Sequence, residues 1–176
     1  GSEIGPISQL LINTSNGYSK QSTVRVEDGG LFRGGAIIVS GVSGNTGSNG
    51  RLEVVGGRLE AVGSGTRGFA IGCGKSSTGW FEMTGGTLVM APGTRVAGGQ
   101  YGLNIGTKLD SSQSSSGYFD LQGGTFDASG VSTVVGYSAN AMHGYVTQSG
   151  GSFLLKDVTI HSGSTWTMTG GTLSAK

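Results

Sequence analysis

Three short segments place a carboxylate two positions after an arginine or an aromatic residue. They read Arg51-Leu52-Glu53, Trp80-Phe81-Glu82 and Tyr118-Phe119-Asp120. Residues two apart in a β-strand point to the same side, so each segment would present a ring or a guanidinium beside an acid. A further segment, Tyr145-Val146-Thr147, keeps the ring and has threonine in place of the acid.

These residue types support three interpretations. Two carboxylates held about 5–9.5 Å apart can cleave glycosidic bonds by general acid/base chemistry. Rings beside carboxylates can instead stack on a sugar and hydrogen-bond its hydroxyls. In the third interpretation the rings pack along a ladder, and Arg25 or Arg51 offsets the neighbouring acids. No histidine or lysine shares these columns, so we expect no catalytic residue and no enzyme activity. The candidate glycan-binding residues are Trp80, Tyr118, Tyr145, Glu82, Asp120 and Arg51.

An internal repeat accounts for the spacing of these segments. A strand-like stretch, a glycine pair and a second strand-like stretch recur at residues 50–61, 79–90, 117–128, 144–155 and 164–175, with a worn copy at 23–32. A short apolar motif precedes each copy, as in Phe69-Ala70-Ile71-Gly72. Six units of three short strands and one variable loop therefore cover residues 10–176.

The glycine pairs admit two structures. Alternating strands around a two-residue Gly-Gly loop can form a β-hairpin. In a coil, the same glycines would turn the chain onto the next face of a solenoid. We favour the coil because only one loop in each unit varies in length, as in solenoids. The fold class that follows is all-β, a right-handed parallel β-helix of about six rungs.

Alternation predicts which side chains fill the interior. On the second strand of each unit, two inward columns are expected, and the strands on either side contribute one each. The members of the four columns are Leu52, Phe81, Phe119, Val146 and Trp166; Val54, Met83, Leu121, Gln148 and Met168; Leu59, Leu88, Phe126, Phe153 and Leu173; and Ile12, Val39, Ile71, Ile105, Val135 and Ile160.

Composition excludes several classes of function. The chain of 176 residues has 37 glycines, 12% charged residues and a net charge of +1, without the basic stripe of a nucleic-acid-binding protein. One cysteine and two histidines make a zinc site implausible. No apolar run reaches the roughly 20 residues of a membrane span. We therefore expect no metal, no cofactor, no nucleic-acid partner and no membrane span.

The repeated unit resembles the glycine-rich repeats of passenger domains in bacterial autotransporters and of related surface proteins with a PEP-CTERM sorting tail. The segments that carry this likeness are Ile71-Gly72, Gly79 to Leu88, Ile105-Gly106 and Gly117 to Phe126. The resemblance implies a secreted β-helix displayed on a cell surface, often an adhesin or a stalk. It therefore implies an extracellular location and a glycan or other host or cell-surface ligand. The alternative function is a polysaccharide lyase or glycoside hydrolase built on a β-helix.

The ends of the repeat lead to a last expectation. Residues 1–9 are taken as a vector-derived scar and a lead-in that drapes over the first rung, and residues 10–176 as one repeat domain. A terminal rung exposes strand edges and an open core. We therefore expect the chain to be a fragment of a longer array, with neighbouring rungs, a cap or another subunit covering its open ends.

Overall fold

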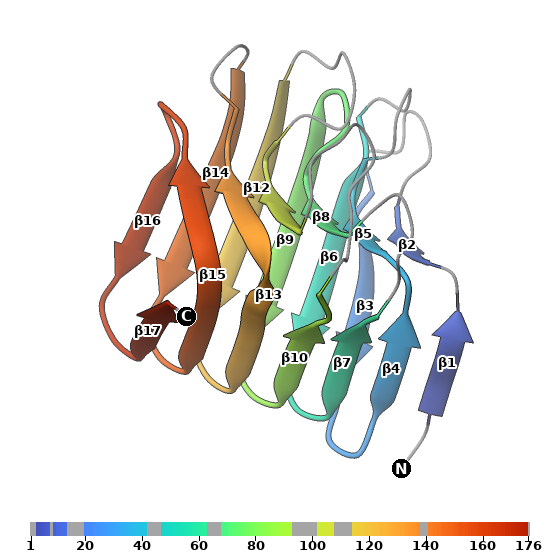
Figure 1. The fold of residues 1–176 in the computed structure, drawn as a ribbon. Helices are drawn as coiled ribbons and strands as arrows, with labels where there is room; N and C mark the ends of the chain where they lie inside the picture. The colour runs from blue at the N-terminus through green and yellow to red at the C-terminus, as the bar shows by residue number, and fades with distance from the viewer. Residues whose placement is uncertain are drawn as a thin grey trace.

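The computed structural model describes residues 3–7, 9–13, 20–41, 47–62, 68–92, 102–107, 114–137 and 141–175. Within these ranges every regular element is a β-strand, and the named strands pair in parallel in two sheets (Figure 1). The prediction of an all-β, solenoid-like chain is confirmed at this level. Among the described residues there is no helix with the length and hydropathy of a membrane span.

The smaller sheet takes one strand from each predicted unit. Its six strands, in spatial order, are β16 (Thr165–Met168), β14 (Ala141–Gln148), β12 (Ser114–Leu121), β9 (Ser77–Met83), β6 (Asn49–Val54) and β3 (Ser22–Val26). Equivalent positions of the repeat pair with each other, so that Phe119 lies opposite Phe81 on one side and Val146 on the other. Equivalent residues of successive repeats therefore lie opposite each other in this sheet.

The larger sheet contains the other strands of the units. Four lie after a corner, namely β4 (Leu31–Gly34), β7 (Arg58–Ala61), β10 (Thr87–Met90) and β17 (Thr172–Ala175), and β1 (Glu3–Ile7) pairs with β4 in the same row. Four carry the short apolar motif, namely β2 (Leu10–Ile12), β5 (Ile37–Val39), β8 (Phe69–Ile71) and β11 (Leu103–Ile105). Two long strands, β13 (Thr125–Val135) and β15 (Ser152–Ile160), run through both rows and join them.

The long strands correct the prediction of three short strands in every unit. In β13 the stretch from Ala128 to Ser132 is an irregularity in the pairing with β15, rather than a loop. The chain therefore passes from one row to the other within a single strand. Longer connections separate β7 from β8 and β10 from β11, whereas only two residues separate β4 from β5.

Residues 3–7 also differ from the expected lead-in. They form β1, which pairs in parallel with β4, with Glu3 opposite Leu31 and Ile4 opposite Phe32. No glycine pair precedes this strand, which is the signal that identified its equivalents in later units. The repeating architecture therefore begins before residue 10.

The glycine pairs are corners between the sheets. Strand β9 pairs with β6 and β12, whereas β10 pairs with β7 and β13. The hairpin alternative at Gly85-Gly86 and Gly123-Gly124 is therefore wrong. The second glycine of each pair lies at positive φ, as Gly86 does at 75°. A Cβ on Gly86 would also lie 2.6 Å from the Gly57 carbonyl oxygen of the preceding corner.

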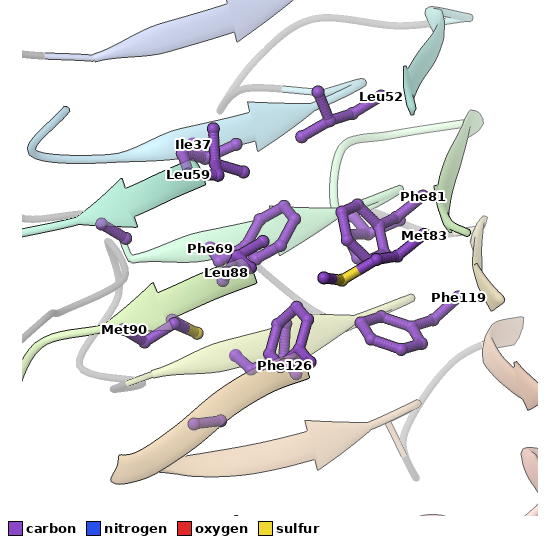
Figure 2. Close-up of a cluster of buried hydrophobic side chains, with 14 of the residues drawn as sticks. Ile37, Leu52, Leu59, Phe69, Phe81, Met83, Leu88, Met90, Phe119 and Phe126 are labelled. Atoms are coloured by element: carbon purple, nitrogen blue, oxygen red, sulfur yellow. The ribbon is translucent and has the colours of Figure 1, made fainter. Parts of the chain in front are cut away.

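The predicted inward columns form the core (Figure 2). Most of their members, from Ile12 to Phe153, are buried and belong to one apolar cluster. Five phenylalanines from three rows are in ring contact, with centroids 4.8–6.0 Å apart. Gln148 is buried but polar, and Trp166 is partly buried. Three members, Ile160, Met168 and Leu173, are 44–45% exposed. They lie on the last strand of each row, beyond which no described strand packs.

One outward-facing surface of the larger sheet is apolar, although alternation predicted polar or small residues there. Ile38 and Ala70 point away from the main core, yet both are fully buried and form a second apolar cluster with Cys73. Burial raises the pKa of the Cys73 thiol, which lies 3.4 Å from the Ile71 carbonyl oxygen. These features favour a packing role for the thiol rather than a reactive one.

A charged cluster on the outside of the larger sheet gives a pH-dependent contribution to stability. Arg58 Nε and Arg33 Nε donate to the two oxygens of Glu60, at 2.5 and 2.6 Å. These hydrogen bonds lower the pKa of Glu60. A lowered folded-state pKa adds stability above the unfolded value of about 4.3, and this contribution is lost as pH falls through the folded value.

The Glu60→Gln variant is therefore expected to be less stable than the parent chain at pH 7. The difference should shrink as pH falls below about 4.3. Urea denaturation between pH 3 and pH 7 measures it. The control is Glu27→Gln, because Glu27 lies 68% exposed in its ion pair. A Glu60→Gln difference that stays constant with pH would contradict the assignment.

Candidate ligand-binding face

A shallow groove of about 260 Å³ lies on the outer face of the six-stranded sheet. All six candidate residues line it, together with Thr147 and parts of Phe81 and Phe119. Four adjacent strands supply them, because β6, β9, β12 and β14 pair in register. The structure thus brings together Arg51, Trp80, Glu82, Tyr118, Asp120 and Tyr145.

Strand alternation explains why these side chains face outward. Along β9 and β12, burial alternates at every position. Phe81 and Phe119 are 1% exposed and anchor the strands to the core, while their neighbours reach solvent. Tyr118 is the most exposed of the three rings, at 38%. The core therefore fixes the base of the groove.

The three aromatic rings stack on each other. Trp80 and Tyr118 have ring centroids 5.8 Å apart and planes at 11°. Tyr118 and Tyr145 are 5.0 Å apart, with planes at 17°. The strand spacing sets this separation, so the faces between neighbouring rings are turned toward one another. The rings therefore form one continuous stack and not three separate platforms for a sugar.

The three stacked rings still present polar groups that a ligand could contact. Among the described residues, neither tyrosine hydroxyl nor the Trp80 Nε1 has a hydrogen-bond partner. The outer face of Tyr145 lies on the side of Thr165, its smaller registered neighbour on β16. The His143 ring also contacts Tyr145, with centroids 6.3 Å apart. A ligand across the groove would thus meet ring edges, two hydroxyls and one indole N–H.

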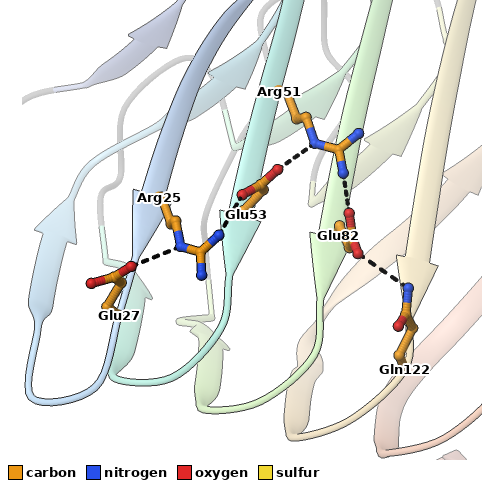
Figure 3. A network of polar contacts seen from close by, with 6 residues as sticks. All are labelled: Arg25, Glu27, Arg51, Glu53, Glu82 and Gln122. Atoms are coloured by element: carbon orange, nitrogen blue, oxygen red, sulfur yellow. Dashed lines mark hydrogen bonds and ion pairs between the residues drawn. The ribbon is translucent and has the colours of Figure 1, made fainter.

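The carboxylates belong to a ladder of ion pairs that runs across the strands (Figure 3). Arg51 Nε donates to Glu53 at 2.6 Å, and its Nη2 donates to Glu82. Arg25 Nε donates to Glu27 at 2.8 Å and its Nη1 to the second oxygen of Glu53 at 3.4 Å. The guanidinium groups thus separate carboxylates that would otherwise repel across the sheet.

Gln122 extends this ladder to the next strand. Its Nε2 donates to Glu82 Oε1 at 3.2 Å and to Asp120 Oδ2 at 2.7 Å. Both oxygens of Glu82 are therefore used within the sheet. The sequence interpretation did not identify this bridging role. The available signal was position, since Gln122 follows Asp120 by two residues and shares its face.

The arrangement matches the packing interpretation for Glu53 and Glu82, whose oxygens all accept hydrogen bonds from neighbouring side chains. Asp120 differs, because among the described residues its side chain contacts no cation. No group of three or more His, Cys, Asp or Glu side chains in the described ranges could hold a metal ion. The groove therefore combines three aromatic rings with one carboxylate, that of Asp120, which forms no ion pair with a described residue.

Within the described part of the chain, the charged groups that line the groove are Arg51, Glu82 and Asp120. Comparisons with protein-family models, with curated proteins and with solved structures find no match.

Proposed function

We propose that this chain is a right-handed parallel β-helix that serves as a non-enzymatic structural or adhesive segment of a secreted or cell-surface bacterial protein. The parallel register of both sheets and the corners at the glycine pairs support the architecture. The location rests on the resemblance of the repeat to those of autotransporter and PEP-CTERM-type surface proteins.

We further propose that the outer face of the six-stranded sheet binds a glycan. The observation that carries this proposal is the stack of Trp80, Tyr118 and Tyr145 along one groove, whose hydroxyl and indole donors have no partner among the described residues. Tyrosine and tryptophan combine an apolar body with a polar tip. That combination suits a sugar, whose ring carbons and hydroxyls lie side by side.

The polysaccharide-cleaving alternative has less support. Glu82 and Asp120 are direct neighbours in register, as a pair of catalytic carboxylates would require. However, the Glu82 oxygens accept hydrogen bonds from Arg51 and Gln122. Gln122 also contacts Asp120, so these groups are tied along the sheet. This arrangement favours binding over cleavage.

A partner at the open end of the stack is also proposed. Val158, Ile160, Met168 and Leu173 are 42–45% exposed although alternation directs them inward. Apolar side chains and unpaired strand edges of this kind are covered in stable arrays. The occupant would be a neighbouring rung, a cap or another subunit.

The glycan proposal predicts the behaviour of a Trp80→Ala, Tyr118→Ala double variant. It should lose at least about tenfold in affinity on a glycan array, because it removes two of three rings, and tenfold corresponds to about 1.4 kcal/mol. A matched control is Thr87→Ala, Thr125→Ala, which alters a registered pair on the other sheet. Circular dichroism confirms that both variants fold.

Two outcomes would contradict this function. Unchanged glycan binding in the folded double variant would exclude the groove as the site. Release of reducing ends from a polysaccharide, abolished by Glu82→Gln or Asp120→Asn, would show that the chain is an enzyme.

A further inference from the structure

We infer that the glycan held by this groove carries free amino groups, and that Asp120 selects it by pairing with a ligand ammonium. This inference rests on the proposed glycan function and adds the class of sugar. Its support is the distribution of charge around the ring stack.

The outer face around the groove is acidic. The ladder contains two guanidinium groups, Arg25 and Arg51, against four carboxylates, which are Glu27, Glu53, Glu82 and Asp120. Both arginines bind glutamates that lie on β6, on β9 or directly after β3. The end of the ladder on β12 therefore has an excess of negative charge.

Asp120 lies at that end and inside the groove. Its described side-chain contact is with the neutral amide of Gln122, at 2.7 Å. Its neighbours in register are Glu82 on β9 and Thr147 on β14. Since neither supplies a positive charge, a cation on the ligand is the complement that this carboxylate lacks.

The position of the aromatic residues also favours a ligand that carries amino groups. Tyr118 and Tyr145 lie two positions before Asp120 and Thr147 on adjacent strands, so the rings and the carboxylate line one groove. A sugar held against the ring edges would therefore lie beside this carboxylate. Uronic acids and sulfated sugars would instead place like charges beside Glu82 and Asp120.

A pair of ligands that differ only at nitrogen tests this inference. A β-linked oligomer of glucosamine and its fully N-acetylated counterpart share one backbone, and only the first carries ammonium groups. We expect the amine form to bind about tenfold more tightly at low salt, as one charge-assisted hydrogen bond allows. The preference should decrease at 1 M salt, because the charges lie at the surface.

The Asp120→Asn variant keeps the shape of the side chain and removes its charge. It should lower the affinity for the amine oligomer by about tenfold and so remove most of the preference between the two oligomers. Glu27→Gln is the control, since Glu27 carries the same charge on the same ladder but does not line this groove. It should leave the preference intact.

The outcomes separate this inference from the function on which it rests. Equal binding of both oligomers that Asp120→Asn leaves unchanged would overturn the amine selectivity, while glycan binding would stand. Binding of neither oligomer, together with no response on the wider array, would overturn both. An oligolysine that binds as tightly as the amine sugar, and is lost equally in Asp120→Asn, would assign the groove to basic peptides instead.

Discussion

Replacing Gly86 with alanine is expected to lower the free energy of unfolding by about 3 kcal/mol or more. Gly86 is at φ 75°, where a side chain is strained. Its added Cβ would also lie 2.6 Å from the Gly57 carbonyl oxygen and 2.7 Å from the Gly56 carbonyl carbon. Those atoms belong to the backbone of the adjacent corner and cannot rotate away. Urea denaturation of the purified variant measures the loss.

Gly47→Ala separates the two causes. Gly47 has φ 71°, yet a Cβ there would meet no atom of the described residues within 4 Å. We expect it to cost about 1–2 kcal/mol, the strain of the left-handed conformation alone. Equal losses in the two variants would show that the close approach of successive corners does not matter, contrary to the proposed reason for the glycine pair.

The second large effect is expected at Phe126. Its ring contacts Phe69, Phe81, Phe119 and Phe153, with centroids 4.9–6.0 Å apart. These partners come from both sheets, so the ring joins the three rows of strands. Truncation to alanine should lower the free energy of unfolding by about 3–5 kcal/mol, as for buried phenylalanines generally.

Leu173→Ala is the matched control for this variant. Leu173 occupies the same column, since Phe126 pairs with Phe153 and Phe153 with Leu173. At 45% exposure, its truncation should cost less than about 1 kcal/mol. A loss at Leu173 comparable to that at Phe126 would mean that the exposed end is covered in solution.

The sequence was most informative where one residue type recurs at one position of the unit. Leu52, Phe81 and Phe119 each lie between a carboxylate and an arginine or aromatic residue, and alternation alone places them inside. The six candidate residues were found in the same way, and all of them line one groove. Periodicity fixes the side of a strand to which a residue points.

Periodicity does not show which outward-facing residues are buried by neighbouring segments of the chain. Ile38 and Ala70 occupy an outward position, and their burial depends on packing outside the strand row. The same limit applies to the groove. Alternation places Trp80, Tyr118 and Tyr145 outward, but stacking of the rings against each other depends on side-chain rotamers. Strand β1 was missed because no glycine pair marks its start.

The order of strands in the sheets has a mechanical consequence. Among the described strands, each is hydrogen-bonded to equivalent strands of adjacent units only. A pulling force between the two ends of the chain would therefore load these rows one after another, peeling off the terminal unit before its neighbour feels the full strain. Extension in an optical trap should then proceed in steps of about one unit. The fold would thus unfold gradually under force rather than all at once.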